Sequence, residues 1–185
     1  KENTKKYKKD YEKWLKSHQP FHWCIEFYGI IDSGGFDVII GNPPYVEYSK
    51  VRNEYQLPRD IYRTECCGNL YSFIVERSFS FIGDKAYSGY IIPTSSISTE
   101  RMKPFQEILY NQGLCHSTFG FRPSKLFEGS KSANIHLSII LINKAFRSII
   151  PSLNHIKWNA NYRKYLFDAL HFFTITEEDV IKHFG

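Results

Sequence analysis

The chain has 185 residues, of which 42% are hydrophobic and 17% aromatic, so it is long enough to form one domain with a proper core and is not disordered in bulk. Its net charge of +5 at neutral pH permits nucleic-acid binding without requiring it. The four cysteines form no Cys-x-x-Cys pair and have no histidine at ligand spacing, so we predict no metal site and a cytoplasmic protein with reduced cysteines. No apolar run is long enough to cross a bilayer and no signal peptide is evident, so we expect no contact with a membrane.

The first segment is polar and rich in lysine, and it predicts a solvated helix over residues 4–18 that Pro20 closes. Residues 21–28 are expected to form an extended lead-in. Two turn-prone glycines, Gly34-Gly35, then precede an apolar run that contains β-branched residues. This run predicts a buried strand over Phe36–Ile40.

The strand ends in the sequence Asn42-Pro43-Pro44-Tyr45, which is the most informative part of the chain. Two consecutive prolines cannot extend a sheet ladder or continue into a helix, because neither has an N–H to donate. The strand therefore presents an amide and a phenol on a stiff turn at its carboxyl end, where ligands bind in open α/β sheets.

The turn offers groups that suit an amino group on an aromatic ring. The side-chain carbonyl of Asn42 and the backbone carbonyl of Pro43 are two acceptors for its two hydrogens, and Tyr45 offers a flat face for stacking. Acceptors that pull on both N–H bonds would free the nitrogen lone pair, which is otherwise delocalised into the ring. Alignment of that nitrogen with an electrophilic carbon would supply much of the remaining rate enhancement.

A polar, tyrosine-rich segment follows over residues 46–67 and has no simple period. Its aromatic and basic side chains are interleaved: Tyr48, Tyr55, Tyr62, Lys50, Arg52, Arg59 and Arg63. Two interpretations stay open, a loop that orders against nucleic acid and a solvated insertion beside the site.

The rest of the pattern alternates between helices and strands. It predicts helices over residues 70–82 and 102–110, a turn at Gly83-Asp84, and strands over residues 90–92, 114–121 and 135–142. The segment between the last two strands is too short for a helix, so we expect these strands to be antiparallel. A short helix over residues 162–170 and a helix start at Thr176 are predicted near the end of the chain.

The order of these elements around the Asn-Pro-Pro-Tyr turn resembles the S-adenosylmethionine-dependent amino-methyltransferases. More specifically, it resembles the adenine-N6 DNA methyltransferases of bacterial restriction–modification systems, of the Eco57I-like type. The matching segments are residues 21–27, 36–45, 69–77, 89–94, 119–129 and 133–142. The turn also occurs in enzymes that methylate protein glutamine or guanine N2 in RNA, so the order of elements is the more specific signal.

This resemblance implies an α/β fold that forms the later half of a Rossmann-like methyltransferase sheet, with mixed strands and an antiparallel edge. It implies a polar helical lead-in at residues 1–20, a partial methyltransferase catalytic domain at residues 21–150, and a connector toward a target-recognition domain at residues 151–185. A location in the bacterial cytoplasm follows from the same resemblance.

The resemblance also implies a reaction and roles for particular residues. A methyl group would pass from S-adenosylmethionine to N6 of an adenine that is flipped out of double-stranded DNA. Asn42 and the Pro43 carbonyl would hold the amine, Pro44 would stiffen the turn, and Tyr45 and Phe127 would sandwich the base, with Phe121 as the alternative to Phe127. Asn42 and Ile74 match positions near the cofactor, although Leu70, Phe73, Ile74 and Phe81 fall at helical spacing and would be core in any α/β domain.

The chain departs from the family before Asn42. It has no glycine-rich turn followed by an acidic residue there, and Gly34-Gly35 lie too close to the catalytic strand to take that part. We therefore expect a piece of a larger protein that binds S-adenosylmethionine weakly or not at all, has no turnover alone, and self-associates through open sheet edges. No convincing nuclease constellation is present, so the sequence does not predict whether cleavage accompanies methylation.

Two other functions stay open. One is an amino-methyltransferase that acts on protein glutamine or RNA guanine, which would not need Phe127 as a stacking partner. The other is a non-catalytic DNA-binding or assembly module that kept the fold, in which Asn42 would have no role.

Overall fold

The computed structural model describes residues 2–54, 56–57, 60–119, 136–143, 149–153 and 172–176, together with the single positions 165, 168, 178 and 182. Contacts divide the chain into two compact units, Lys1–Gly35 and Phe36–Gly185. No helix in the described residues is long and apolar enough to cross a membrane.

The first unit is helical. Helix α1 (Glu2–His18) confirms the predicted polar helix. Its aromatic rings stack along one stripe at spacings of three and four residues, with centroids 6.3, 6.0 and 5.4 Å apart: Tyr7, Tyr11, Trp14 and His18.

The extended lead-in predicted for residues 21–28 is wrong. Two short helices occupy this region and the residues after it, α2 (Trp23–Glu26) and α3 (Tyr28–Asp32). The rings of Trp23 and Phe27 lie four residues apart and pack with centroids 5.4 Å apart, which a helical turn allows and an extended chain does not.

The second unit is built on a six-stranded mixed sheet with the order β1-β2-β4-β3-β5-β6. Its strands are β1 (Phe36–Gly41), β2 (Ile82–Pro93), β3 (Leu114–Phe119), β4 (Leu137–Asn143), β5 (Ile149–Leu153) and β6 (Phe172–Thr176). The pairs β1–β2 and β3–β5 are parallel, whereas β2–β4, β3–β4 and β5–β6 are antiparallel. The predicted α/β class with an antiparallel edge is confirmed, including the antiparallel pair β3–β4.

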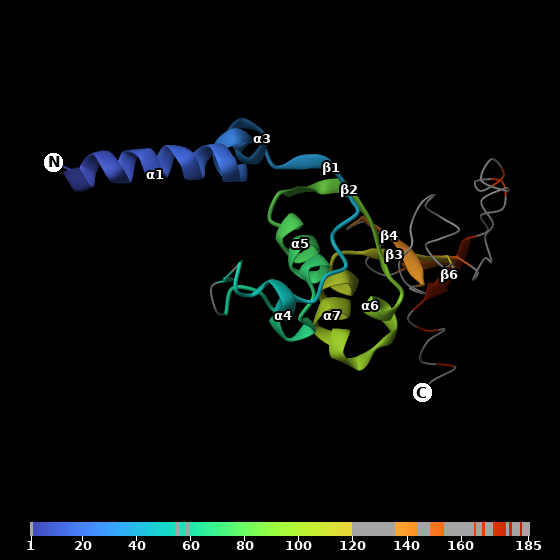
Figure 1. Ribbon diagram of the computed structural model, residues 1–185. Coiled ribbons are helices and arrows are strands. Elements are labelled where there is room, and N and C mark those ends of the chain that lie inside the picture. The colour runs from blue at the N-terminus through green and yellow to red at the C-terminus, as the bar shows by residue number, and fades with distance from the viewer. Residues whose placement is uncertain are drawn as a thin grey trace. The chain divides into compact units, whose positions relative to one another are not determined.

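Helices α5 (Leu70–Ser78), α6 (Ser95–Ser98) and α7 (Lys103–Asn111) lie together along the sheet (Figure 1). Two short elements, α4 (Tyr48–Val51) and η1 (Glu65–Cys67), lie between β1 and α5, and η2 (Glu100–Met102) lies between α6 and α7. Helix α7 agrees with the helix predicted over residues 102–110, and Gly113 follows it with a φ of 80°.

The helix predicted over residues 70–82 and the turn predicted at Gly83-Asp84 are wrong in their bounds. Helix α5 ends at Ser78, and β2 already begins at Ile82 and runs through both turn residues. The early start of β2 is explained by pairing, because Ile82 is the partner of Phe36 at the start of β1. Local sequence carries no sign of this partner, which lies 46 residues away.

The end of the chain contains two strands that the sequence did not predict, β5 and β6. Thr176, predicted to start a helix, is the last residue of β6, and Glu178 two residues later is helical. The helix predicted over residues 162–170 falls mostly outside the described residues.

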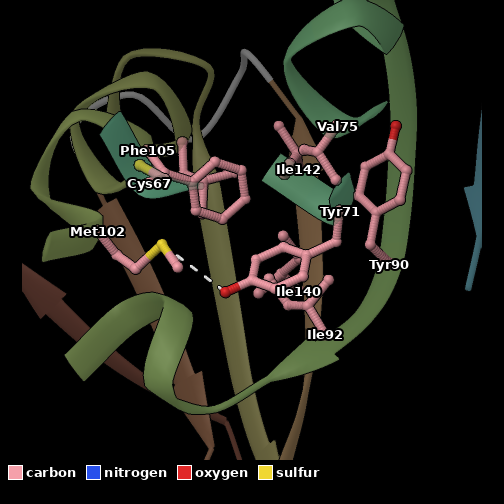
Figure 2. Packing of buried hydrophobic residues seen from close by; sticks show 10 residues of the cluster. Cys67, Tyr71, Val75, Tyr90, Ile92, Met102, Phe105, Ile140 and Ile142 are labelled. Carbon is pink, nitrogen blue, oxygen red and sulfur yellow. Dashed lines mark hydrogen bonds between the residues drawn. The ribbon is translucent and has the colours of Figure 1, made fainter. Parts of the chain in front are cut away.

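The core lies between the helices and one face of the sheet (Figure 2). Side chains from α5 and α7 pack against inward residues of β2 and β4, and these include Tyr71, Val75, Phe105, Tyr90, Ile92, Ile140 and Ile142. The Tyr71 hydroxyl lies in this core and donates to the sulfur of Met102 at 3.7 Å. Phe73 and Phe81 are buried as predicted, but Ile74 is 44% exposed, so the alternative that it packs in the core is wrong.

The opposite face of β1, β2 and β4 carries apolar side chains that these helices do not cover. Val38 and Ile40 on β1 share this face with Tyr87 on β2 and Leu141 on β4, and all four are exposed. A hollow of about 900 Å³ lies over it, bordered at one end by Asn42. The two faces of the sheet therefore differ sharply in burial.

We predict losses of very different size in the free energy of unfolding for two isoleucine truncations on these faces. Ile140→Ala removes a fully buried side chain and should lower the free energy of unfolding by about 2–4 kcal/mol. Ile40→Ala removes a side chain that is 82% exposed and should cost less than about 1 kcal/mol. Urea unfolding of the chain measures both, and similar losses would contradict the assignment of the two faces.

Candidate functional site

The Asn-Pro-Pro-Tyr turn lies where the sequence placed it, directly after β1. Because β1 and β2 are parallel, the turn sits at the carboxyl end of a parallel pair, where ligands bind in open α/β sheets. Pro43 is buried, whereas Asn42 and Pro44 are exposed and Tyr45 is half-buried. The amide that the sequence nominated as an acceptor is thus accessible to a ligand.

The hydroxyl of Tyr45 ties the turn together and fastens it to the sheet. Its oxygen lies 2.7 Å from Oδ1 of Asn42 and 2.9 Å from the carbonyl oxygen of Ile91, both within hydrogen-bond distance. The β1–β2 ladder ends one residue earlier on β2, at the pair Gly41–Tyr90. The phenol therefore takes the place of a ladder partner at the point where the chain turns away from the sheet.

The surroundings of the Tyr45 ring keep its phenol neutral. The ring meets the buried Tyr71 ring edge to face, with centroids 6.4 Å apart. Burial raises the pKa of Tyr45 to about 12, because removal from water disfavours the charged phenolate. The hydroxyl is therefore a proton donor throughout the physiological pH range.

The chain that leaves the turn is held by the segment that enters α5. The backbone N–H of Leu70 donates to the Val46 carbonyl at 2.9 Å, and the N–H of Tyr48 donates to the Gly68 carbonyl at 2.8 Å. Between these two bonds lies an antiparallel bridge of Glu47 with Asn69. The turn is thus fixed on both sides, by β1 before it and by this bridge after it.

The Glu47 carboxylate joins three elements at this bridge. It accepts from Nδ2 of Asn69 at 3.2 Å and from Nη2 of Arg101 at 3.2 Å. Gly68 has a left-handed φ of 64°, and a Cβ at this position would overlap the Arg101 guanidinium. The left-handed backbone favours a glycine here, and any side chain would displace the Arg101 guanidinium from Glu47.

The insertion over residues 46–67 is anchored to α5. The rings of Tyr48 and Tyr62 pack on Phe73, with centroids 5.5 and 5.3 Å away. The Glu76 carboxylate accepts from the backbone N–H of Arg63 at 2.9 Å and from the N–H and hydroxyl of Thr64 at 3.0 and 2.7 Å. Two of the three tyrosines considered for stacking on nucleic acid are thus packed against the protein, and the third, Tyr55, lies outside the described residues.

The other predicted site residues are placed as follows. Ile74 lies on α5 with an exposed side chain, and it stays a prediction as a cofactor contact. Phe127 and its alternative Phe121 lie outside the described residues. Sequence reasoning missed Ile91, Glu47 and Arg101, because these partners are joined only by the fold.

Of the two residues predicted to contact an adenosyl cofactor, Asn42 directly follows β1 and Ile74 lies on α5. Gly34 and Gly35 have positive φ angles of 112° and 100°, and they precede β1 in the chain, whereas the turn follows it. Asn42 is the only predicted cofactor contact that borders the hollow over the sheet. In the described residues no group of three or more His, Cys, Asp or Glu side chains could hold a metal ion.

The known sequences that are similar to this chain agree with one another in how they are described. Residues 1–127 match the model of the family described as Eco57I restriction-modification methylase. The chain is 33% identical over 147 residues to RM.MjaORFECS2P of Methanocaldococcus jannaschii, covering 78% of this chain and 12% of that protein, whose name describes a type II restriction enzyme and methyltransferase. It is 25% identical over 142 residues to the type II restriction enzyme and methyltransferase RM.Eco57I of Escherichia coli, covering 72% of this chain and 14% of the relative. The type II methyltransferase M.HincII of Haemophilus influenzae is 28% identical over 121 residues, covering 62% of this chain and 24% of the relative. The chain thus spans between about an eighth and a quarter of the lengths of these relatives.

Solved structures share the fold at low sequence identity. The DrdV–DNA complex superposes with a TM-score of 0.56 at 14% identity, covering 82% of this chain and 18% of that one. A nuclease-deletion mutant of the Type ISP restriction-modification enzyme LlaGI, in complex with a DNA substrate mimic, gives a TM-score of 0.53 at 15% identity, covering 77% of this chain and 14% of that one.

The Tyr45 phenol predicts a loss of stability at alkaline pH. Its pKa is raised in the folded state, so the unfolded chain releases this proton first, near pH 10, and stability falls as pH rises from about 10 to about 12. Tyr45→Phe should therefore lose less stability than the wild type between about pH 8 and about pH 11. Urea unfolding at both pH values measures this, and equal losses in the two proteins would argue against a buried phenol at position 45.

Gly68→Ala should weaken the bridge that follows the turn. The substitution places a side chain in a left-handed conformation and against Arg101, so we expect a loss of about 1–3 kcal/mol in the free energy of unfolding. Gly29→Ala is the matched control, because no atom lies within 4 Å of a Cβ there. A loss at position 68 no larger than at position 29 would contradict this account.

Proposed function

The chain belongs to the Eco57I restriction-modification methylase family, and we propose that its protein transfers a methyl group from S-adenosylmethionine to N6 of an adenine in double-stranded DNA. The observation that carries the proposal is the accessible Asn42 amide at the carboxyl end of β1, fixed by Tyr45 and the prolines. Relatives described as type II methyltransferases and a structural neighbour solved with DNA support the choice of DNA as substrate. A location in the bacterial cytoplasm stays part of this proposal.

The residues of this chain would act on the amine. N6 of adenine is paired inside a duplex, so the base must leave the stack before the turn can reach it. Asn42 Oδ1 and the Pro43 carbonyl then accept from its two hydrogens, which favours a tetrahedral nitrogen with a free lone pair. Tyr45 and Phe127 would hold the ring of the base between them.

S-adenosylmethionine would supply the electrophilic methyl group. The contribution of this chain is orientation of the nitrogen and stabilisation of the charge that develops on it as it reacts. The proton would leave after methyl transfer, and water is its proposed acceptor.

Asn42→Ala in the intact protein tests the proposal. Loss of a fixed acceptor at a reacting atom costs about 10²–10³ in rate in comparable sites, so N6-methyladenine should fall by at least about a hundredfold. Mass spectrometry of nucleosides from DNA incubated with each protein measures the product. Asn111→Ala, which changes an exposed amide at the end of α7, is the control and should keep wild-type activity.

The alternatives give different products in the same experiment. DNA that is bound but never methylated would overturn the proposal in favour of a non-catalytic binding module. A methylated protein or RNA in place of DNA would indicate an amino-methyltransferase that acts on glutamine or guanine.

A further inference from the structure

The Tyr45 hydroxyl has one proton but lies within hydrogen-bond distance of two acceptor atoms. Its hydroxyl oxygen lies 2.7 Å from Oδ1 of Asn42 and 2.9 Å from the carbonyl oxygen of Ile91, and both of these atoms are acceptors. A phenol has one proton, so it can donate fully to only one of them at a time. The Ile91 carbonyl is part of β2 and has no donor to offer in return. Asn42 does have one, because its amide carries an NH₂ group as well as an oxygen.

Half a turn of the Asn42 amide about its terminal torsion removes the conflict. Nδ2 then occupies the place of Oδ1 and donates to the Tyr45 oxygen, while the Tyr45 proton goes to the Ile91 carbonyl. Every group in the chain of three is satisfied, and Oδ1 faces away from Tyr45. Because Asn42 is exposed, that oxygen is accessible to a ligand.

We propose that Tyr45 is a positioning residue whose hydroxyl selects this orientation of the Asn42 amide, so that Oδ1 rather than Nδ2 meets the amino group of the substrate. The inference rests on the proposed function, since it concerns how the same amine is held. In the reverse orientation the NH₂ group of Asn42 would face the NH₂ group of the base, donor against donor, and could not accept its hydrogens. The hydroxyl thus has a role separate from the stacking role proposed for the ring.

The test compares loss of the hydroxyl in two backgrounds of the intact protein. Tyr45→Phe keeps the ring but leaves the Asn42 amide free to turn, so kcat for methylation should fall by about fivefold, the equivalent of one ordinary hydrogen bond, while KM for DNA changes little. An aspartate at position 42 offers an acceptor oxygen in either orientation. In the Asn42→Asp background, Tyr45→Phe should therefore change kcat by less than about twofold.

Tyr71→Phe is the matched control for removing a phenol near the site. Its hydroxyl contacts Met102 and not Asn42, so this variant should keep wild-type kcat. Equal losses of kcat from Tyr45→Phe in both backgrounds, or an equal loss from Tyr71→Phe, would overturn the inference, because the hydroxyl would then act only through the stability of the fold.

Neutron diffraction supplies a readout that does not depend on activity. It should locate two deuterons on the Asn42 atom that faces Tyr45, and one deuteron between Tyr45 and the Ile91 carbonyl. A bare oxygen facing Tyr45 would overturn the inference even in a fully active enzyme. If the wild-type protein methylated no DNA, the proposed function would fail, and the deuteron positions would still decide the orientation of the amide.

Discussion

The site depends on one constraint, which is that the chain cannot continue β1 beyond Gly41. Pro43 and Pro44 have no N–H for a sheet ladder, so the backbone must leave the edge of β2 at that point. The Ile91 carbonyl would lose its partner there, and the Tyr45 hydroxyl supplies one at 2.9 Å. A single phenol therefore keeps the sheet satisfied and fixes the turn, which leaves the neighbouring Asn42 exposed and still held in place.

A turn held only from one side would pivot, and the contacts after it prevent this. The Glu47–Asn69 bridge connects the outgoing chain to the start of α5, and α5 is fixed in turn by Tyr71 and Val75 in the core. Arg101 extends the same contact toward α7 through the Glu47 carboxylate. This ion pair is exposed, so it contributes little on its own and serves mainly to fix geometry. The two backbone hydrogen bonds on either side of the bridge are the stronger restraint.

The success of sequence reasoning followed the range of the interactions involved. The strand Phe36–Ile40, the turn after it and helix α7 were predicted because their signals are local, in apolar runs, prolines and a glycine stop. The start of β2 at Ile82 was missed because a strand 46 residues earlier determines it. Strand β6 was missed although its residues, Phe-Phe-Thr-Ile-Thr, are the aromatic and β-branched types that favour strands. The same limit applies to the site. The sequence nominated Asn42 and Tyr45. Ile91 lies 46 residues from its partner Tyr45, and Arg101 lies 54 residues from its partner Glu47, so both could be found only in the folded chain. The core position predicted for Ile74 was wrong because a local signal misled. Its helical spacing suggested burial, but its side chain points away from the core.

Alternation along β1 determines which side of the sheet each of its side chains faces. Ile39 packs against the core, whereas Ile40 faces the open side of the sheet, and Asn42 borders the hollow on that same side. The helix side holds the packed core of Tyr71, Tyr90 and their neighbours, and the Tyr45 ring packs against it. Asn42 thus lies at the carboxyl end of the parallel pair, next to the hollow over β1, β2 and β4.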